Sequence, residues 1–159
     1  MSQSRYDETR TCSSDIQDHL PYFVDLCITH NIQTVIELGV RGGISTAAWL
    51  WGLEQTGGHL YSVDIDSAPY EADNWTFIQG DDLIIADQLP DEADVIFVDT
   101  SHTYEQTKAE IELYLPRTRK FMLFHDTDVA EFGVRRALDE LCLGWTERPG
   151  SNGLGVVTI

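Results

Sequence analysis

The chain has 159 residues, of which 42% are hydrophobic, and this composition excludes an intrinsically disordered protein. A chain of this length buries roughly 70% of the surface of its unfolded form, which suits one domain that folds without disulfides. The 27 acidic and 10 basic residues give a formal net charge of −17, and such a surface repels nucleic acid and anionic membranes. We therefore expect a small-molecule partner, no nucleic acid and no membrane.

The three cysteines are Cys12, Cys27 and Cys142, and none of them has CxxC spacing. The sequence therefore indicates neither a disulfide framework nor a zinc site, and free buried thiols in a reducing compartment are the simplest interpretation. The first residues contain no apolar segment of the signal-peptide type, so the expected location is the cytoplasm.

Secondary structure is expected to begin after residue 13. Residues 1–13 are polar and without pattern, and we expect a flexible tail there, followed by a single domain over residues 14–159. Capping residues and apolar residues at helical spacing predict a first helix that ends near His30, which Pro21 either splits or opens. Beyond it, apolar runs alternate with helical patterns. The expected strands are 34–40, 59–65, 75–80, 94–99 and 120–126, and the expected helices are 45–55, 82–89 and 104–115.

Apolar residues from Val134 to Cys142 recur at helical spacing and predict one more helix, which Gly144 ends. Residues 145–159 predict two short strands around a turn of Pro, Gly, Ser and Asn. The earlier runs are almost continuously apolar, as is typical of strands buried on both faces. The expected fold is α/β: a doubly wound, Rossmann-like sheet of seven mostly parallel strands, with an antiparallel C-terminal hairpin and helices on both faces.

Polar residues gather where the expected strands end, which is where such a sheet binds its ligand. The first run leads through Glu37, Gly39 and Gly43 into a helix that opens with Ser45, and the amides of that helix N-terminus are free. The spacing G-x-x-G-G differs from the dinucleotide fingerprint GxGxxG, and Glu37 would repel a pyrophosphate. A cationic or zwitterionic ligand suits this turn better, although an ordinary turn between a strand and a helix also accounts for the glycines.

Acidic residues end the next two runs. Asp64 follows the glycine turn by about 20 residues, where an acid can bind two ribose hydroxyls. Asp81 and Asp82 end the third run, where a carboxylate could accept a hydrogen bond from an adenine amino group. Each acid alone is more often a helix N-cap, but three such strand ends after a glycine turn favour a ligand.

The order E-x-G-x-x-G-G, VDID and GDD resembles the class I S-adenosylmethionine-dependent methyltransferases, over essentially all of residues 13–159. The resemblance implies S-adenosylmethionine as the cofactor. It also implies which residues bind it: Glu37, Gly39 and Gly43 the methionine part, with Ser45 at the adjoining helix start, Asp64 the ribose, and Asp81 or Asp82 the adenine.

The fourth and fifth runs end in Asp99 with His102 and in His125 with Asp126. Neighbouring strand ends face one crevice, and carboxylates with one or two imidazoles suit a divalent ion such as Mg²⁺ or Mn²⁺. The alternative is that Asp99 caps the following helix and that His102 is a plain loop residue.

The arrangement D-x-x-H-x-Y-E followed by H-D resembles the metal-dependent O-methyltransferases, whose fold is shared by cephalosporin-hydroxylase-like proteins. This resemblance implies Asp99 and Asp126 as metal ligands, His125 as a third ligand and His102 as the general base, so that Asp99 and His102 form the catalytic pair. Relatives often carry another acid before the final aspartate, and His125 departs from that pattern.

The expected function is therefore methyl transfer from S-adenosylmethionine to an oxygen of a small molecule, with a divalent metal as an optional partner. Two alternatives stay open: an S-adenosylmethionine-binding protein without methyl transfer, and an NAD-type Rossmann enzyme. His19, before the first strand, is interpreted as a surface residue, with a place beside the site as the second interpretation. A homodimer is compatible with the sequence but has no signature in it.

Overall fold

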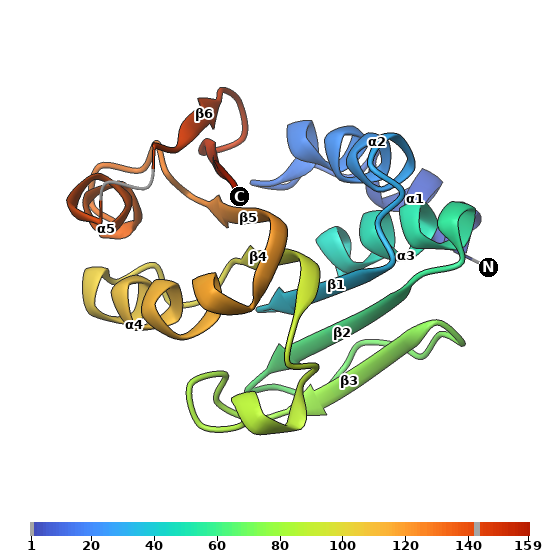
Figure 1. Ribbon diagram of the computed structural model, residues 1–159. Helices are drawn as coiled ribbons and strands as arrows, with labels where there is room; N and C mark the ends of the chain where they lie inside the picture. The colour runs from blue at the N-terminus through green and yellow to red at the C-terminus, as the bar shows by residue number, and fades with distance from the viewer. Residues whose placement is uncertain (1, 142–143) are drawn as a thin grey trace.

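A seven-stranded sheet organises the computed structural model, which describes residues 2–141 and 144–159 (Figure 1). The strand order is β3-β2-β1-β4-β5-β7-β6. Strands β1 to β5 are parallel, and β7 runs antiparallel to both β5 and β6. The strands are β1 (Thr34–Leu38), β2 (His59–Asp64), β3 (Trp75–Gln79), β4 (Ala93–Val98), β5 (Thr118–His125), β6 (Thr146–Arg148) and β7 (Leu154–Thr158). The expected doubly wound sheet with a C-terminal hairpin is confirmed.

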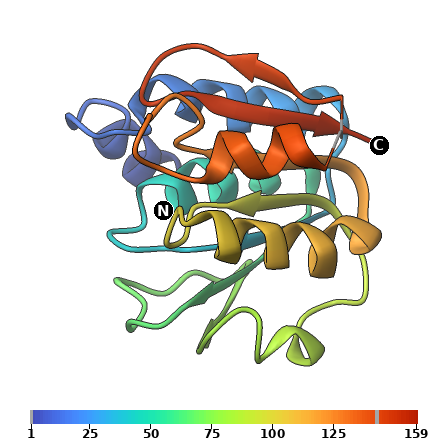
Figure 2. The same ribbon diagram turned by 90° about the vertical axis from the view of Figure 1, so that its left-hand side faces the viewer.

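Helices cover both faces of this sheet. On one face lie α1 (Ser2–Thr9), α2 (Leu20–Thr29) and α3 (Ile44–Thr56), and on the other α4 (Tyr104–Tyr114) and α5 (Val134–Glu140) lie side by side (Figures 1 and 2). The described residues also form three short 3-10 helices: η1 (Gln17–His19), η2 (Ala86–Gln88) and η3 (Leu115–Arg117). No helix in the described ranges has the length and apolar character needed to cross a membrane.

The central strands are buried on both sides, which explains their almost continuous apolar sequence. In β1, Val35 packs into the core beneath α2 and α3, whereas Ile36 packs into the core beneath α4 and α5. In β4, Phe97 and Ile96 divide in the same way between the two cores. Because the strands are parallel, their carboxyl ends meet at one edge of the sheet.

Two segments differ from expectation. The expected tail over residues 1–13 was wrong in its described part, because Ser2–Thr9 form α1, which packs on α3 and buries Tyr6. The helix has no apolar stripe, and the aromatic ring of Tyr6 anchors it. The helix expected over 82–89 is reduced to η2, since the side chain of Asp81 accepts a hydrogen bond from the Leu83 N–H and Pro90 follows closely.

Most other local expectations hold. Pro21 stands in the first turn of α2, so it opens that helix, and η1 precedes it. Cys12 and Cys27 are free thiols, and Cys27 is buried as expected. The burial expected for Cys12 is wrong, since its side chain is exposed. The stripe expected up to Cys142 ends at Glu140 in the described helix, and Cys142 itself lies outside the described residues.

Gly39 lets the loop after β1 touch the loop after β4. Its φ is +92°, and a Cβ atom at this position would lie 2.1 Å from the carbonyl oxygen of Asp99. On either side of this contact, the Gly39 N–H donates to Val63 O (2.9 Å) and the Asp99 N–H donates to Leu38 O (2.8 Å). A side chain at position 39 would therefore push apart the two loops that carry the candidate site.

We predict that Gly39→Ala lowers the free energy of unfolding by about 2 kcal/mol or more, because the added methyl group meets backbone at a positive φ. Gly42→Ala is the matched control in the same turn. Apart from its two chain neighbours, no described residue has an atom within 4 Å of a Cβ there. Urea unfolding of both variants measures the difference. Equal stability of the two variants would contradict this account of the turn.

Candidate functional site

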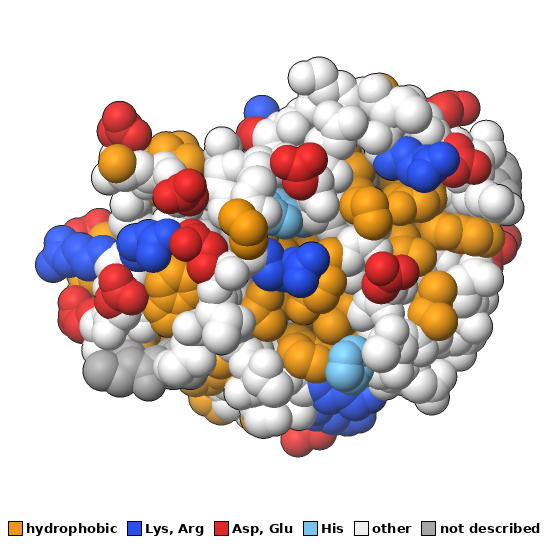
Figure 3. Space-filling model, turned by 90° about the horizontal axis from the view of Figure 1, so that it is seen from above, with side chains coloured by type: hydrophobic (Ala, Val, Ile, Leu, Met, Phe, Trp, Pro, Cys, Tyr) orange, Lys and Arg blue, Asp and Glu red, His pale blue; other side chains and the backbone are white. Residues whose placement is uncertain are grey.

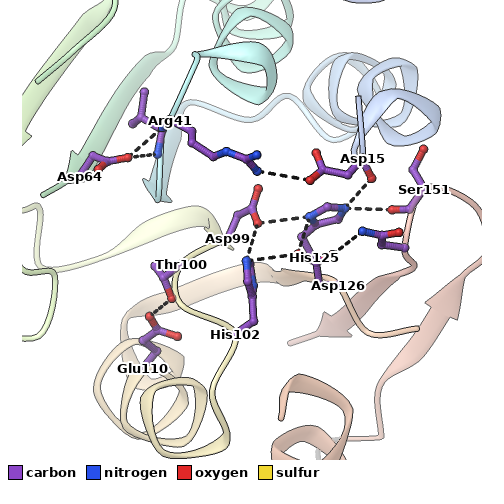
Figure 4. A network of polar contacts seen from close by, with 12 residues as sticks. Asp15, Arg41, Asp64, Asp99, Thr100, His102, Glu110, His125, Asp126 and Ser151 are labelled. Carbon is purple, nitrogen blue, oxygen red and sulfur yellow. Dashed lines mark hydrogen bonds and ion pairs between the residues drawn. The ribbon is translucent and has the colours of Figure 1, made fainter. Parts of the chain in front are cut away.

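Polar side chains from the ends of β1, β2, β4 and β5 form a connected group at the carboxyl edge of the sheet (Figure 4). Asp64 lies on one side with the glycine turn, and the cluster of Asp99, His102, His125 and Asp126 lies on the other. The close contact of Gly39 with Asp99 joins the loops that carry these two halves.

Asp64 anchors the glycine turn through backbone amides. Its Oδ2 accepts from the N–H groups of Val40 (2.7 Å) and Arg41 (2.8 Å), and its Oδ1 accepts from Asp66 N–H (2.9 Å). Burial acts to raise the pKa of Asp64, but these amides outweigh it and lower the pKa below its ordinary value. The result is an ionised, half-buried carboxylate beside the glycine turn.

Glu37 lies beneath the turn and is fully buried. Its Oε1 accepts from Ser45 Oγ (2.7 Å), and its Oε2 accepts from Thr46 Oγ1 (2.8 Å) and Ser62 Oγ (2.7 Å). Burial raises its pKa to about 7 against the effect of these hydroxyls. Glu37 and Ser45 thus hydrogen-bond to each other and help to join β1, β2 and α3 under the turn. Both side chains are buried, whereas the sequence suggested that they face a ligand.

Gly43 opens α3 at a φ of +73°, and its carbonyl oxygen accepts from the hydroxyl of Tyr70 (3.0 Å). The Tyr70 ring covers the place where a Cβ of Gly43 would stand. Arg5 of α1 lies over the same ring, 3.7 Å from its centroid. The loop after β2 therefore holds the turn from outside, and α1 holds that loop.

The two acids after β3 separate in the structure. Asp81 is exposed, whereas Asp82 is buried and its Oδ1 accepts from the side-chain amide of Gln106 on α4 (3.1 Å). Asp81 is thus the one that faces outward beside Asp64. Two aliphatic side chains stand beside these acids, Ile65 at 72% exposure and Ile84 at 76%. Neither isoleucine was expected from the sequence, although an apolar residue directly after the strand-ending Asp64 is a readable signal.

The second half of the site gathers all four residues that the sequence singles out after β4 and β5. Nδ1 of His125 lies 3.2 Å from Asp99 Oδ1 and 3.2 Å from Asp126 Oδ2. Nε2 of His102 lies 3.3 Å from Asp126 Oδ2 and 3.8 Å from Asp99 Oδ1. Their juxtaposition is as expected, and Figure 4 shows both rings turned toward the carboxylates.

Among the described residues, the polar partners of both ring nitrogens of His125 are all acceptors. Its Nε2 lies 2.9 Å from the carbonyl oxygens of Asp15 and Ser151, while its Nδ1 faces the two carboxylates. Burial acts to lower the pKa of His125, but its bonds to Asp126 and Asp99 raise it to about 11. Both ring nitrogens therefore carry protons at neutral pH, and the imidazolium balances one of the two carboxylates.

His102 is more open and is held by its backbone and one aromatic neighbour. It has a φ of +58°, its carbonyl oxygen accepts from Gly133 N–H (2.8 Å), and its ring stacks on Phe132 with centroids 4.8 Å apart. Its side chain is 19% exposed, against 1% for His125. Of the two histidines, His102 is the one that a small molecule can reach.

The residues present fit a divalent cation. Asp99, His125 and Asp126 each offer one ligand atom, and these atoms lie within 4.8 Å of one another. The Nε2–H of His125 is already fixed by carbonyl oxygens, as is usual for a metal-binding histidine. Nδ1 can hold either a proton or an ion, so a bound ion would replace the proton there.

Residues remote in sequence complete this cluster. The side-chain amide of Asn152 donates a hydrogen bond to Asp126 Oδ1 (2.8 Å). From the sequence, Asn152 was expected only as part of the turn in the C-terminal hairpin. Asp15 also places its carboxylate 3.3 Å from Arg41 Nη1 of the glycine turn. The surface position expected for His19 is wrong, since its side chain is buried and its ring centroid lies 6.1 Å from that of His125.

We predict that His125→Ala lowers the free energy of unfolding by about 3 kcal/mol or more in the presence of a chelator. The buried carboxylate of Asp126 and the partly buried one of Asp99 then lose their cation. His102→Ala should cost much less, since its more exposed ring leaves no buried charge unpaired. Denaturant unfolding of the two variants provides the comparison. Similar losses for both would show that His125 is not the structural cation of the cluster.

Comparison with known proteins identifies the family to which the chain belongs. A family described as a methyltransferase domain matches residues 36–127, which is more than half of the chain. No curated protein sequence matches it. The matched range begins in β1 and ends directly after Asp126, so it contains both halves of the site except the contacts from Asp15, Ser151 and Asn152.

Solved structures share the fold at low sequence identity. An O-methyltransferase from Bacillus cereus in complex with SAH (S-adenosylhomocysteine) superposes with a TM-score of 0.73 at 14% identity, covering 98% of this chain and 90% of that one. A SAH-bound methyltransferase from Podospora anserina gives 0.70 at 17%, covering 98% and 86%. The O-methyltransferase TomG from Streptomyces achromogenes, in complex with SAM (S-adenosylmethionine), gives 0.69 at 15%, covering 93% and 81%.

The fold of these structures agrees with the class I architecture that the strand-end motifs indicate. The match over residues 36–127 establishes the relationship at the level of sequence. The chain belongs to the methyltransferase-domain family.

Proposed function

We propose that the protein binds S-adenosylmethionine at the glycine turn and transfers its methyl group to an oxygen of a small molecule. The observation that carries this proposal is the methyltransferase-domain match over residues 36–127, which spans the glycine turn, Asp64 and the cluster of Asp99 and Asp126. Two of the structures with the same fold are described as O-methyltransferases, one with SAH and one with SAM.

The edge of the sheet offers this cofactor carboxylate groups and exposed apolar side chains. Asp64 is ionised and half-buried, as a carboxylate that binds ribose hydroxyls needs to be. Asp81 offers an exposed carboxylate to the adenine amino group, and the exposed side chains of Ile65 and Ile84 offer apolar surface to the ring. The buried Glu37 supports the turn from below, so its contribution to binding is to position the backbone.

The chain's own residues then align the acceptor and remove its proton. When bound, S-adenosylmethionine supplies a methyl group on a positively charged sulfur. Nε2 of His102 faces Asp126 Oδ2 at 3.3 Å, and with its proton on this side the imidazole keeps a lone pair on Nδ1. Nδ1 can accept the proton of an acceptor hydroxyl, and a base placed in this way contributes about 10²–10⁴-fold to the rate.

We further propose that Asp99, Asp126 and Nδ1 of His125 bind a divalent ion, Mg²⁺ or Mn²⁺. When bound, such an ion lowers the pKa of a hydroxyl that coordinates it. Two carboxylates and one imidazole are a donor set that suits these ions, and their ligand atoms lie within 4.8 Å of one another.

We predict that His102→Asn lowers kcat by about 10²-fold or more while the affinity for S-adenosylhomocysteine is kept, because only the base is lost. Asparagine is chosen since it tolerates the positive φ of this position. His59→Asn, at the opposite edge of the sheet, is the control. Transfer of labelled methyl groups to a panel of hydroxylated acceptors provides the readout, and full turnover by His102→Asn would remove His102 from the mechanism.

For the metal, we predict that exhaustive chelation lowers the methyl-transfer rate and that Mg²⁺ or Mn²⁺ restores it. Asp99→Asn should lose activity and raise the ion concentration needed, because one negatively charged ligand is gone. Asp91→Asn removes the same charge at an exposed position and serves as the control. Undiminished turnover in chelator, together with a silent Asp99→Asn, would contradict the metal site.

A further inference from the structure

Two buried carboxyl groups outside the catalytic cluster meet between the turn after β3 and helix α4. Asp82 belongs to the turn and is 7% exposed, and Glu110 belongs to α4 and is 0% exposed. One amide group, Nε2 of Gln106, donates to both of them, to Asp82 Oδ1 and to Glu110 Oε1, each at 3.1 Å. The shared donor therefore holds the two carboxyl groups close together.

No positive charge in the described part of the chain balances this pair. None of the ion pairs formed by the described residues includes Asp82 or Glu110. Asp82 Oδ2 and Glu110 Oε2 are both buried, and neither receives a hydrogen bond from a donor in the described part of the chain. Two ionised carboxylates in this setting would repel each other without compensation, whereas one proton between them satisfies both oxygens.

The surrounding titratable groups do not alter this balance. Asp81, on the same turn, adds negative charge, while Tyr114 of α4 donates its hydroxyl to the backbone carbonyl of Asp82 (2.6 Å). Arg117 lies beyond the Tyr114 ring and donates to Ala86 O. Burial raises the pKa of Glu110 to about 8, and the charge of Asp82 acts in the same direction. Burial likewise raises the pKa of Asp82.

Glu110 also reaches the loop that carries the catalytic cluster. Its Oε1 accepts from Thr100 Oγ1 at 2.5 Å, and Thr100 directly follows Asp99 (Figure 4). A single side chain of α4 therefore contacts the turn beside the expected adenine position on one side and the loop of Asp99 and His102 on the other.

We propose that Glu110 is a protonated positioning residue, which donates its carboxyl O–H to Asp82 and so joins the cofactor turn to the catalytic loop. This inference rests on the proposed function, because that function assigns cofactor binding to the turn of Asp81 and Asp82, here called the cofactor turn. Loss of the proton at alkaline pH turns the hydrogen bond into a repulsion between two carboxylates. The turn then separates from α4, and binding of the cofactor weakens.

Glu110→Gln imitates the protonated form, because its carbonyl oxygen accepts from Thr100 and Gln106 while its N–H group donates to Asp82. Glu112→Gln removes the same charge from an exposed position on α4 and serves as the matched control. The native pKa of Glu110 is raised above its unfolded value, so its contribution to stability declines as pH rises from the ordinary Glu range up to about 8.

The first experiment measures unfolding against pH without any cofactor. From about pH 7 to about pH 8, the folding equilibrium constant of the wild type and of Glu112→Gln should fall with pH more steeply than that of Glu110→Gln, by up to about tenfold per pH unit. Parallel curves for all three proteins would overturn the shared proton. Asp82→Asn provides a second test if Glu110→Gln does not fold: without its charged neighbour, Glu110 should ionise at lower pH, and an unmoved pH step would overturn the pairing.

The second experiment titrates the same proteins with S-adenosylhomocysteine at neutral and alkaline pH. The dissociation constant of the wild type should rise with pH, whereas that of Glu110→Gln should stay nearly constant. The same pH dependence in both would overturn the coupling to the cofactor turn. Failure of the wild type to bind at any pH would overturn the proposed function and this coupling with it, while the unfolding curves still decide the shared proton.

Discussion

The contact of Gly39 with the backbone of Asp99 sets the relation between the two halves of the site. It is a steric constraint, since the carbonyl oxygen of Asp99 occupies the place of a Cβ at residue 39. Through it the turn that Asp64 anchors and the loop that carries His102 meet at the edge of the sheet. In the proposed function, a methyl donor would bind on one side and a base would stand on the other. Methyl transfer would then need their positions to be fixed, because the reacting atoms must lie in line.

A chain with a formal net charge of −17 must also stabilise the acids that it buries near this edge. It does so in four different ways. Hydroxyl groups bind Glu37, backbone amides bind Asp64, an imidazolium lies between Asp99 and Asp126, and we infer a shared proton for Asp82 and Glu110. On the face in Figure 3, the Lys and Arg side chains are interspersed with Asp and Glu and form no continuous basic surface.

The fold and the gathering of the strand-end residues could be predicted because both follow from simple periodicity. Doubly buried strands are apolar throughout, and parallel strands bring the residues after them to one edge. The direction of each side chain was not predictable in this way. Glu37 and Asp82 stand at the expected positions but turn inward, because hydroxyls of α3 and an amide of α4 receive them there.

The remaining contacts of the site could not be predicted from the pattern of side chains in the sequence. The partners of His125 Nε2 are backbone carbonyls of Asp15 and Ser151, which stand 110 and 26 residues away in sequence. In the sequence, Glu110 looks like any other polar residue of α4. Its burial against Thr100 and Asp82 is what distinguishes it from the exposed acids of that helix. Helix α1 was missed since one buried tyrosine gives no periodic signal.

The most direct test of the central claim is a calorimetric titration with S-adenosylhomocysteine, with NADH as the competing dinucleotide and Asp64→Asn beside the wild type. The account predicts micromolar binding of S-adenosylhomocysteine to the wild type, clearly weaker binding to Asp64→Asn, and no binding of NADH. Tight binding of NADH, or no binding of S-adenosylhomocysteine with or without divalent ions, would contradict it and leave the edge of the sheet to another ligand.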